Sequence, residues 1–130
     1  MSVRRPAPRR VLLALLALGL VLALAACGDG SSGGLTAVEI NAPGLRFDKE
    51  ELVIAAGTDV EVTMTNVAGI HNFAVYASQE EAEAKTEAIA ATEVCRTGCI
   101  AKLTLNLPPG EYFFRCDIHP SRMTGTLIAR

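Results

Sequence analysis

The feature that most constrains the fold of this chain is a strict alternation of apolar and polar residues between Asp59 and Asn66. Val60, Val62 and Met64 fall on one side of this pattern, followed there by the smaller Asn66, and acidic residues and threonines fall on the other. Because successive side chains of a strand point to opposite faces, a period of two over this length predicts a half-buried β-strand.

Several other short segments have the same character and are separated by turn-forming residues such as Pro108-Pro109-Gly110. Short strands joined by turns at close intervals are typical of an antiparallel sandwich or barrel, so the sequence predicts an all-β domain. The further predicted strands are Thr36–Ile40, Leu52–Ile54, His71–Tyr76, Lys102–Leu107, Glu111–Cys116 and Gly125–Ala129.

The segment from Ser78 to Ala91 breaks the β pattern because it is rich in alanine and glutamate. Ser78 followed by Glu81 resembles a helix start, and Glu81 and Lys85 stand four residues apart in the order that stabilises a helix. We therefore expect a short surface helix over Gln79–Glu87, inserted between two strands, with its charges forming a solvated face.

The first 26 residues have the pattern of a secretory signal peptide, with four arginines before an apolar run that reaches Ala26. The run is slightly short for a membrane span, which needs about 20 residues. Cys27 follows directly and resembles the lipidated cysteine of bacterial lipoproteins, whose thiol receives the lipid. We favour this interpretation over an uncleaved anchor helix or an ordinary cleaved signal. The Arg9-Arg10 pair leaves twin-arginine export open, although its surroundings match that pattern weakly.

The predicted organisation has three parts: a lipoprotein signal peptide over residues 1–26, a flexible Gly/Ser tether over residues 27–35 and one folded domain over residues 36–130. Removal of the signal peptide takes away four arginines. It leaves eight basic against fourteen acidic residues, a net charge of about −6. An acidic chain repels nucleic acid, so we expect no nucleic-acid partner, whereas a basic protein partner fits the charge.

A run near the C-terminus brings three potential metal ligands, Cys116, His119 and Met123, within eight residues. The chain has only two histidines, and the other one, His71, lies far upstream. Two histidines and one cysteine, with a methionine as weak axial ligand, are the ligand set of blue-copper electron-transfer sites. Soft sulfur ligands suit Cu(I) and imidazoles serve both oxidation states, so the set suits an ion that cycles between Cu(I) and Cu(II).

The strand pattern can bring these ligands together. Cys116 shares a strand face with Phe114, and the charged Arg115 lies on the opposite face, so Cys116 should point into the core. His71 shares its face with the apolar Phe73 and should point into the same core. The loop after Cys116 would then carry the other two ligands back over this end of the domain.

Each of these residues also has an ordinary structural interpretation. His71 alone fits a core or surface histidine, Cys116 a buried hydrophobe and Met123 a core side chain. The combination favours the metal site, since a buried free thiol in an oxidising compartment needs a reason. Asn72 points away from its neighbour His71 and could tie the two ligand loops together from outside the ligand set. Ordinary turn chemistry is the alternative for Asn72.

Cys95 and Cys99 remain once Cys27 is assigned to lipid and Cys116 to the metal. In an oxidising compartment two remaining cysteines are expected to form a disulfide, and Gly98 would help so short a loop to turn back. A second metal site or a redox-active pair is the alternative. A binuclear copper centre fails on spacing, because Cys99 lies 17 residues before Cys116.

Together these motifs resemble the cupredoxin superfamily of small blue-copper proteins, which includes plastocyanin, amicyanin and azurin. The resemblance spans about residues 36–130. It rests on His71-Asn72-Phe73, on the strand from Tyr112 to Cys116, and on the spacing Cys116-x₂-His119-x₃-Met123 followed by Gly125. We expect Gly125 to let the chain turn into the last strand.

The resemblance implies a Greek-key β-sandwich and one type 1 copper ion bound by His71, Cys116, His119 and Met123. The spacing from cysteine to histidine matches plastocyanin and amicyanin. The spacing from histidine to methionine lies between theirs, so the subfamily stays open. The inserted helix and the Cys95/Cys99 pair also depart from these relatives.

We therefore expect a monomeric electron carrier without enzymatic activity, exported and lipid-anchored to the cell membrane so that it faces the periplasm or exterior. Its partners would be redox proteins, such as a cytochrome or a membrane respiratory complex. A copper-delivery or copper-storage lipoprotein is the alternative. The closed set of four ligands favours the carrier, because an exchangeable site is better left open, and a Cys/His site also accepts zinc.

Overall fold

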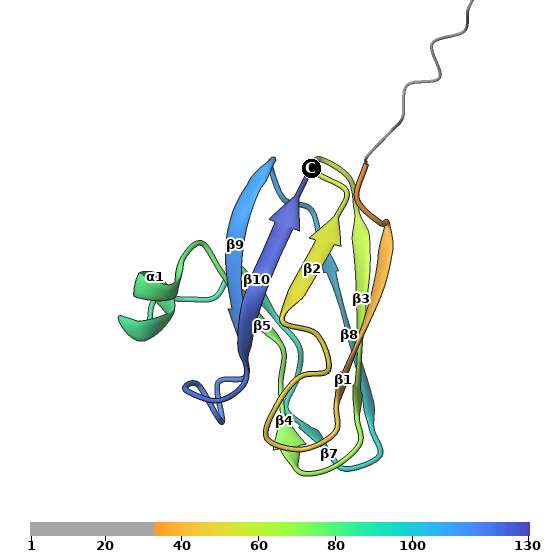
Figure 1. Cartoon of the computed structure of the whole chain (residues 1–130), viewed down its shortest axis with the longest axis vertical. Helices are drawn as coiled ribbons and strands as arrows, with labels where there is room; N and C mark the ends of the chain where they lie inside the picture. Colours follow the sequence, from red (N-terminus) through yellow and green to blue (C-terminus); the bar gives the residue numbers. More distant parts are fainter. Residues whose placement is uncertain (1–32) are drawn as a thin grey trace, which may run out of the picture.

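A computed structural model describes residues 33–130 of the chain (Figure 1). The predicted signal peptide, the lipidated Cys27 and most of the predicted tether lie outside the described residues. The elements, in chain order, are β1 (Ala37–Ala42), β2 (Glu51–Ile54), β3 (Val60–Asn66), β4 (Ile70–His71), β5 (Ala74–Tyr76), α1 (Gln79–Glu83), β6 (Ala90–Ala91), β7 (Cys95–Arg96), β8 (Ile100–Leu105), β9 (Gly110–Arg115) and β10 (Thr124–Ala129).

The strands form a two-layered β-sandwich with one short helix, which confirms the predicted fold class. One sheet has the strand order β2-β10-β9-β5-β6 and the other has the order β1-β3-β8. Strands β4 and β7 form a small separate sheet at one end of the sandwich (Figure 1). The short strand β4 and the strand β5 replace the single strand expected over His71–Tyr76, because the chain leaves one sheet and joins another between them.

The prediction of a wholly antiparallel sandwich was wrong in part. Strand β1 pairs with β3 in parallel, and β2 pairs with β10 in parallel, whereas the remaining strand pairs are antiparallel. Alternation in the sequence reveals which face of a strand is buried but carries no information about its neighbour. The consecutive strands β1 and β2 therefore join different sheets, each beside a partner from elsewhere in the chain.

The core lies between the two sheets and follows the predicted strand phases. The side chains of Val60, Val62 and Met64 are fully buried, as the alternation of β3 predicts. At the end nearer β4, Phe73 and Phe114 stack at 5.0 Å between ring centroids. A third aromatic ring was not predicted from the sequence: the segment between β1 and β2 turns inward there and inserts Phe47 edge-on against both rings, at 5.9 Å and 5.6 Å.

Gly125 has a different role from the predicted turn. It lies inside β10, paired with Phe114 of β9. A Cβ atom at this position would lie 2.2 Å from the Phe114 ring and 2.5 Å from the backbone oxygen of Glu50. The glycine is therefore required because a neighbouring ring and a neighbouring strand approach it closely, and not because the backbone turns.

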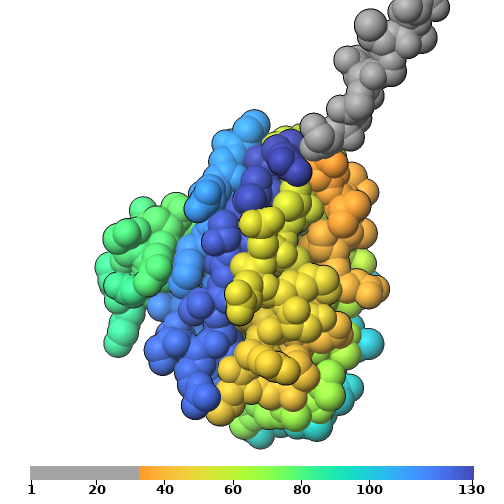
Figure 2. Space-filling view, in the orientation of Figure 1, coloured from red at the N-terminus to blue at the C-terminus, as the bar shows by residue number. Residues whose placement is uncertain are grey.

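The inserted helix is confirmed but is shorter than predicted. Ser78 caps its start by accepting a hydrogen bond from the backbone N–H of Glu81, and the helix ends at Glu83, with Ala84 as its C-cap. Lys85 then adopts a left-handed conformation, with φ of 58°, so the predicted Glu81–Lys85 helical pair does not form. Ala82 is buried against the outer side of β5, and the helix stands out from the body (Figures 1 and 2).

The folded region begins slightly earlier than residue 36. The backbone N–H of Gly34 donates to the carbonyl of Arg130, and Leu35 bridges to Ile54 in parallel. The last residues of the predicted tether are thus joined to the end of the sandwich where the chain also ends (Figure 1). Within residues 33–130, no helix has the length and apolar character needed to cross a membrane.

Candidate metal centre

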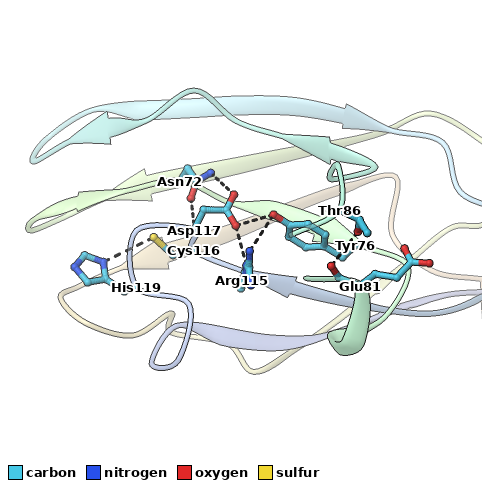
Figure 3. Close-up of polar contacts among 8 residues, drawn as sticks. All are labelled: Asn72, Tyr76, Glu81, Thr86, Arg115, Cys116, Asp117 and His119. Carbon is cyan, nitrogen blue, oxygen red and sulfur yellow. Dashed lines mark hydrogen bonds and ion pairs between the residues drawn. The ribbon is translucent and has the colours of Figure 1, made fainter. Parts of the chain in front are cut away.

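Three of the predicted ligands converge at the end of the sandwich that carries β4. The Sγ atom of Cys116 lies 3.8 Å from Nδ1 of His71 and 3.8 Å from Nδ1 of His119. The two Nδ1 atoms lie 3.2 Å apart. One nitrogen or sulfur atom from each residue thus lies within 4.8 Å of the other two. Figure 3 shows Cys116 and His119 facing each other.

Backbone hydrogen bonds close the loop that supplies Cys116, His119 and Met123. The N–H of Cys116 donates to the carbonyl of Met123, over 2.9 Å, at the point where β9 and β10 separate. The N–H groups of His119 and Met123 donate in turn to the carbonyls of Cys116 and His119, each over 3.1 Å. Cys116 and Met123 are fully buried and belong to the main hydrophobic core. The loop is therefore held in shape by the chain itself.

His71 is oriented by its own loop. Its Nε2 atom lies 2.7 Å from the carbonyl oxygen of Ala68, and a carbonyl can only accept a hydrogen bond. Nε2 therefore carries the proton in the neutral ring, and the lone pair of Nδ1 points toward Cys116 and His119. A hydrogen bond of this kind fixes both the tautomer and the direction of a metal-binding histidine.

Asn72 connects the two segments that carry the ligands. Its Oδ1 atom accepts a hydrogen bond from the backbone N–H of Asp117, over 2.7 Å, and its Nδ2 atom donates to the Asp117 carboxylate, over 3.1 Å. Asp117 directly follows Cys116, and Asn72 directly follows His71. The side chain thus bonds the other ligand loop, as the sequence predicted, and Figure 3 shows its contacts with Asp117.

Arg115 lies on the face of β9 opposite Cys116, as predicted, but that face is covered. The residue is only 9% exposed, because the inserted segment around α1 covers this side of β9. Its Nε donates to the Asp117 carboxylate over 2.8 Å, and its guanidinium carbon lies 4.8 Å from the centre of the Tyr76 ring. The Tyr76 hydroxyl donates to the same carboxylate over 2.7 Å. A charged residue directly after three aromatic residues was the one sequence signal for this network.

The network holds Asp117 ionised. Partial burial alone would raise the pKa of Asp117, but hydrogen bonds from Tyr76, Asn72 and Arg115, together with the charge of Arg115, lower it. Burial, and then the hydrogen bond to Asp117, raise the pKa of the Tyr76 hydroxyl. The residue next to Cys116 is therefore a carboxylate whose charge is balanced by a buried arginine.

The predicted disulfide between Cys95 and Cys99 is present, and Cys116 is the free cysteine of the described residues. The disulfide lies close to the candidate metal centre, because Cys95 of β7 pairs directly with His71 of β4. This proximity could not be predicted, since the two residues are far apart along the chain.

The donor atoms fit a bound copper ion. Two imidazole bonds of about 2 Å to one metal would separate their nitrogens by roughly 3–3.5 Å, and the two Nδ1 atoms here are 3.2 Å apart. The thiol of Cys116 is buried with no other role in the core, and the thioether of Met123 is buried in the same cluster. Two nitrogens, a thiolate and a nearby thioether form the donor set that suits copper in both oxidation states.

Comparison with known proteins agrees with this geometry. Residues 34–130 match the family of copper binding proteins described as the plastocyanin/azurin family. The chain belongs to that family. A search of curated protein sequences found no match.

Solved structures of blue-copper proteins resemble the chain as well. The dithionite-reduced auracyanin of Roseiflexus castenholzii is 27% identical, with a TM-score of 0.64 over 75% of this chain and 99% of its own. Auracyanin A of Chloroflexus aurantiacus, a "blue" copper protein, is 25% identical, with a TM-score of 0.65 over 72% of this chain and 98% of its own. Auracyanin B, at 24% identity over 75% of this chain and 96% of its own, shares the fold with a TM-score of 0.60.

These matches confirm the expected cupredoxin-like sandwich and its cofactor. The chain is a blue copper protein with one type 1 copper ion. Proteins of this family are electron carriers rather than enzymes.

Proposed function

We propose that this protein carries single electrons between redox proteins while a lipid on Cys27 holds it at the outer face of the cell membrane. In this proposal His71, Cys116, His119 and Met123 hold the copper ion. The bound ion supplies one-electron chemistry, Cu(II) being reduced by a donor and Cu(I) reoxidised by an acceptor. The protein keeps the ligands in nearly the same positions in both states.

The observation that carries this proposal is the rigid arrangement of the ligands. His71 is held through its Nε2 atom, and the loop of Cys116, His119 and Met123 is closed by its own backbone hydrogen bonds. Electron transfer is fast when little must move between oxidation states, and a preformed set of ligands meets that need. A catalytic copper would need an open position, which the buried Met123 side chain would block.

His119 offers a route for electrons to enter and leave. It is half-buried, whereas His71 is only 1% exposed. A shallow hollow beside the two histidines is lined by apolar side chains, among them Leu45, Ile70 and Ile118, which are 46%, 38% and 46% exposed. Such a rim can exclude water when a partner binds over the imidazole, so donor and acceptor would both dock here.

The position at which the described chain begins suits the proposed anchor. The described chain starts beside its own C-terminus, at the end of the sandwich far from β4 and from the loop that precedes β10 (Figure 1). An anchor at Cys27 would therefore attach to the end opposite the copper site. The site would face away from the lipid surface, toward the periplasm or exterior, where a cytochrome or a membrane respiratory complex could reach it.

Copper delivery or storage is the second candidate. Transfer of the ion to another protein would need a ligand that can leave, and the half-exposed His119 is the one ligand within reach of solvent. The buried thiolate and thioether oppose rapid exchange, so electron transfer is favoured. The two functions differ in one measurable respect: a carrier keeps its copper through many redox cycles, whereas a delivery protein loses it to the acceptor.

Absorption spectroscopy of the copper-loaded protein tests the proposal. A thiolate bound to Cu(II) should give an intense band near ~600 nm that bleaches on reduction and returns on oxidation. Cys116→Ser should abolish the band. Cys95→Ser/Cys99→Ser is the control for the identity of the sulfur ligand: it removes two other sulfur atoms, so an intense band should persist even where its shape changes. Absence of the band from the wild-type protein would contradict the copper assignment. Loss of the copper to a chelator within a few redox cycles would favour delivery.

A further inference from the structure

The backbone of Gly69, two residues before His71, is held at both its N–H and its carbonyl by one side chain. The hydroxyl of Thr97 accepts a hydrogen bond from the N–H of Gly69 over 2.9 Å and donates to its carbonyl over 3.3 Å. Thr97 is itself exposed, but its hydroxyl is directed at this one residue. Gly69 adopts a φ of 101°, a conformation that glycine tolerates and other residues rarely adopt.

Asn66 holds the backbone of the same residue from the buried side. Its Nδ2 atom donates to the carbonyl of Gly69 over 3.1 Å and to the carbonyl of Cys95 over 2.7 Å. Both partners are acceptors, so the orientation of the amide is unambiguous. Its Oδ1 atom is buried and has no hydrogen-bond partner among the described residues. A buried polar atom without a partner lowers stability, and an apolar side chain at this position would avoid that loss. The role of the amide is therefore the pair of hydrogen bonds from Nδ2 to the two carbonyls.

The disulfide constrains the loop from which Thr97 makes its contacts. Cys95 and Cys99 close the short loop that carries Thr97. The carbonyl of Cys99 accepts a hydrogen bond from the N–H of Asn66, and the N–H of Gly98 donates to the carbonyl of Asn66, over 2.9 Å and 2.7 Å. The loop and Asn66 therefore form one unit on which the segment from Ala68 to His71 rests.

The position of Gly69 controls the ring of His71. A Cβ atom on Gly69 would lie 2.7 Å from Nε2 of His71, so the ring packs directly against this glycine. The same Nε2 atom bonds the carbonyl of Ala68, the preceding residue. A shift of the Gly69 backbone would therefore change the surface against which the His71 ring packs. It would also move the carbonyl of Ala68, which orients that ring.

We propose that Thr97 and Asn66 are positioning residues for His71, and that the Cys95–Cys99 disulfide keeps them in place. They act through the backbone of Gly69 and make no hydrogen bond to any of the four candidate ligands. This inference rests on the proposed role of His71 as a copper ligand, although the orientation of its ring is a property of the copper-free protein as well.

Thr97→Val tests the inference, because it removes the hydroxyl at an exposed position and keeps the shape of the side chain. In the copper-free protein we expect the Nε2 proton of His71, followed by NMR, to exchange with solvent about tenfold faster, as expected for the loss of one hydrogen bond. Thr97→Ser restores the hydroxyl and should restore slow exchange. Thr104→Val, the same change at an exposed position of β8, is the matched control and should exchange like wild type.

The copper-loaded variants give the second measurement. Thr97→Val should broaden or shift the copper EPR spectrum and release copper to a chelator about tenfold faster. Cys95→Ser/Cys99→Ser should change the spectrum and the release rate in the same direction.

Wild-type proton exchange in Thr97→Val, or failure of Thr97→Ser to restore it, would overturn the inference. If instead the wild-type protein has no blue band but the exchange rates differ as expected, the proposed function fails and the positioning role stands.

Discussion

At the scale of single residues, the two histidines have the same chemistry and different surroundings. His71 is buried and oriented by a carbonyl, whereas His119 lies half-exposed on a loop. The residue types and their spacing were sufficient to single out both of them, together with Cys116. The contacts that orient His71 could not be predicted, because Ala68 and Gly69 contribute through their backbone and no side-chain pattern marks them.

Met123 provides the prediction at this scale. Met123→Leu should keep the fold, because the two side chains have similar volumes and such exchanges usually cost less than ~1.5 kcal/mol. The variant should still bind copper and stay blue. Its reduction potential should rise, since loss of a weak donor destabilises Cu(II) more than Cu(I). Voltammetry of both proteins makes the comparison, with Met64→Leu in the core of β3 as the matched control. An unchanged potential would mean that Met123 is not the axial ligand.

At the scale of elements, the strands were predictable and the inserted segment only in part. Alternation located β3, β8 and β9 to within a few residues, because each has one face in the core. The helix was predicted too long because local signals mark its start at Ser78, whereas its end depends on how the segment packs on β5 and β9. That packing also explains why Arg115, charged and on the outer face, is buried.

The Cys95–Cys99 disulfide should contribute to stability in addition to its place beside His71. A disulfide across so short a loop restricts the unfolded chain by about 2 kcal/mol in the loop-entropy description. Cys95→Ala/Cys99→Ala should lower the free energy of unfolding of the copper-free protein by about that amount, as measured by urea denaturation. Reductant should have the same effect on the wild type and none on the variant. Equal stability with and without the disulfide would contradict this expectation.

The segment between β1 and β2 gives a pH-dependent prediction. Asp48 accepts two hydrogen bonds from Asn41, each 2.7 Å long, and so fastens the segment that inserts Phe47 into the core. Burial alone would raise the pKa of Asp48, but the bonds from Asn41 and the charge of Lys49 lower it below 3.8. The unfolded chain therefore binds this proton more readily, and the stabilisation present above pH 3.8 is lost as the pH falls through the lower pKa.

Asp48→Asn should remove this dependence. Between about pH 5 and pH 3, the copper-free wild type should lose more free energy of unfolding than the variant does. Asp59→Asn, which removes the same charge at the start of β3, is the control and should keep the wild-type loss. Parallel pH profiles for wild type and Asp48→Asn would show that the stabilising contact between Asn41 and residue 48 does not depend on the charge.

At the scale of the whole molecule, the candidate metal centre and the ends of the described chain lie at opposite ends of the sandwich. Loops at one end hold the candidate ligands and the apolar rim around His119, and the described chain starts and finishes at the other (Figure 1). An anchored electron carrier needs this arrangement, because its partners must reach the site while the lipid stays in the membrane.

The proposed anchor at Cys27 can be tested directly. Cys27→Ser removes the thiol that would receive the lipid, so the exported protein should move from the membrane fraction to the soluble fraction. Its blue spectrum and potential should not change, because Cys27 is none of the candidate copper ligands. Membrane fractionation followed by immunoblotting measures the distribution. Retention of Cys27→Ser in the membrane would point to an uncleaved anchor helix.

From the sequence alone we predicted an all-β domain, the candidate ligands, the disulfide pairing and the position of the helix, and the family resemblance narrowed the fold to a β-sandwich. All of these depend on residue type and local spacing, which a chain carries before it folds. The structure was needed to show that β1 pairs in parallel with β3 and β2 with β10, that Phe47 inserts into the core and that Arg115 is buried. It was also needed to show that Asn66 and Thr97 hold the backbone of Gly69 beside His71. These features depend on contacts between segments that are distant in the chain. Such contacts are made by backbone groups and by packing surfaces, and no local sequence pattern identifies the partner.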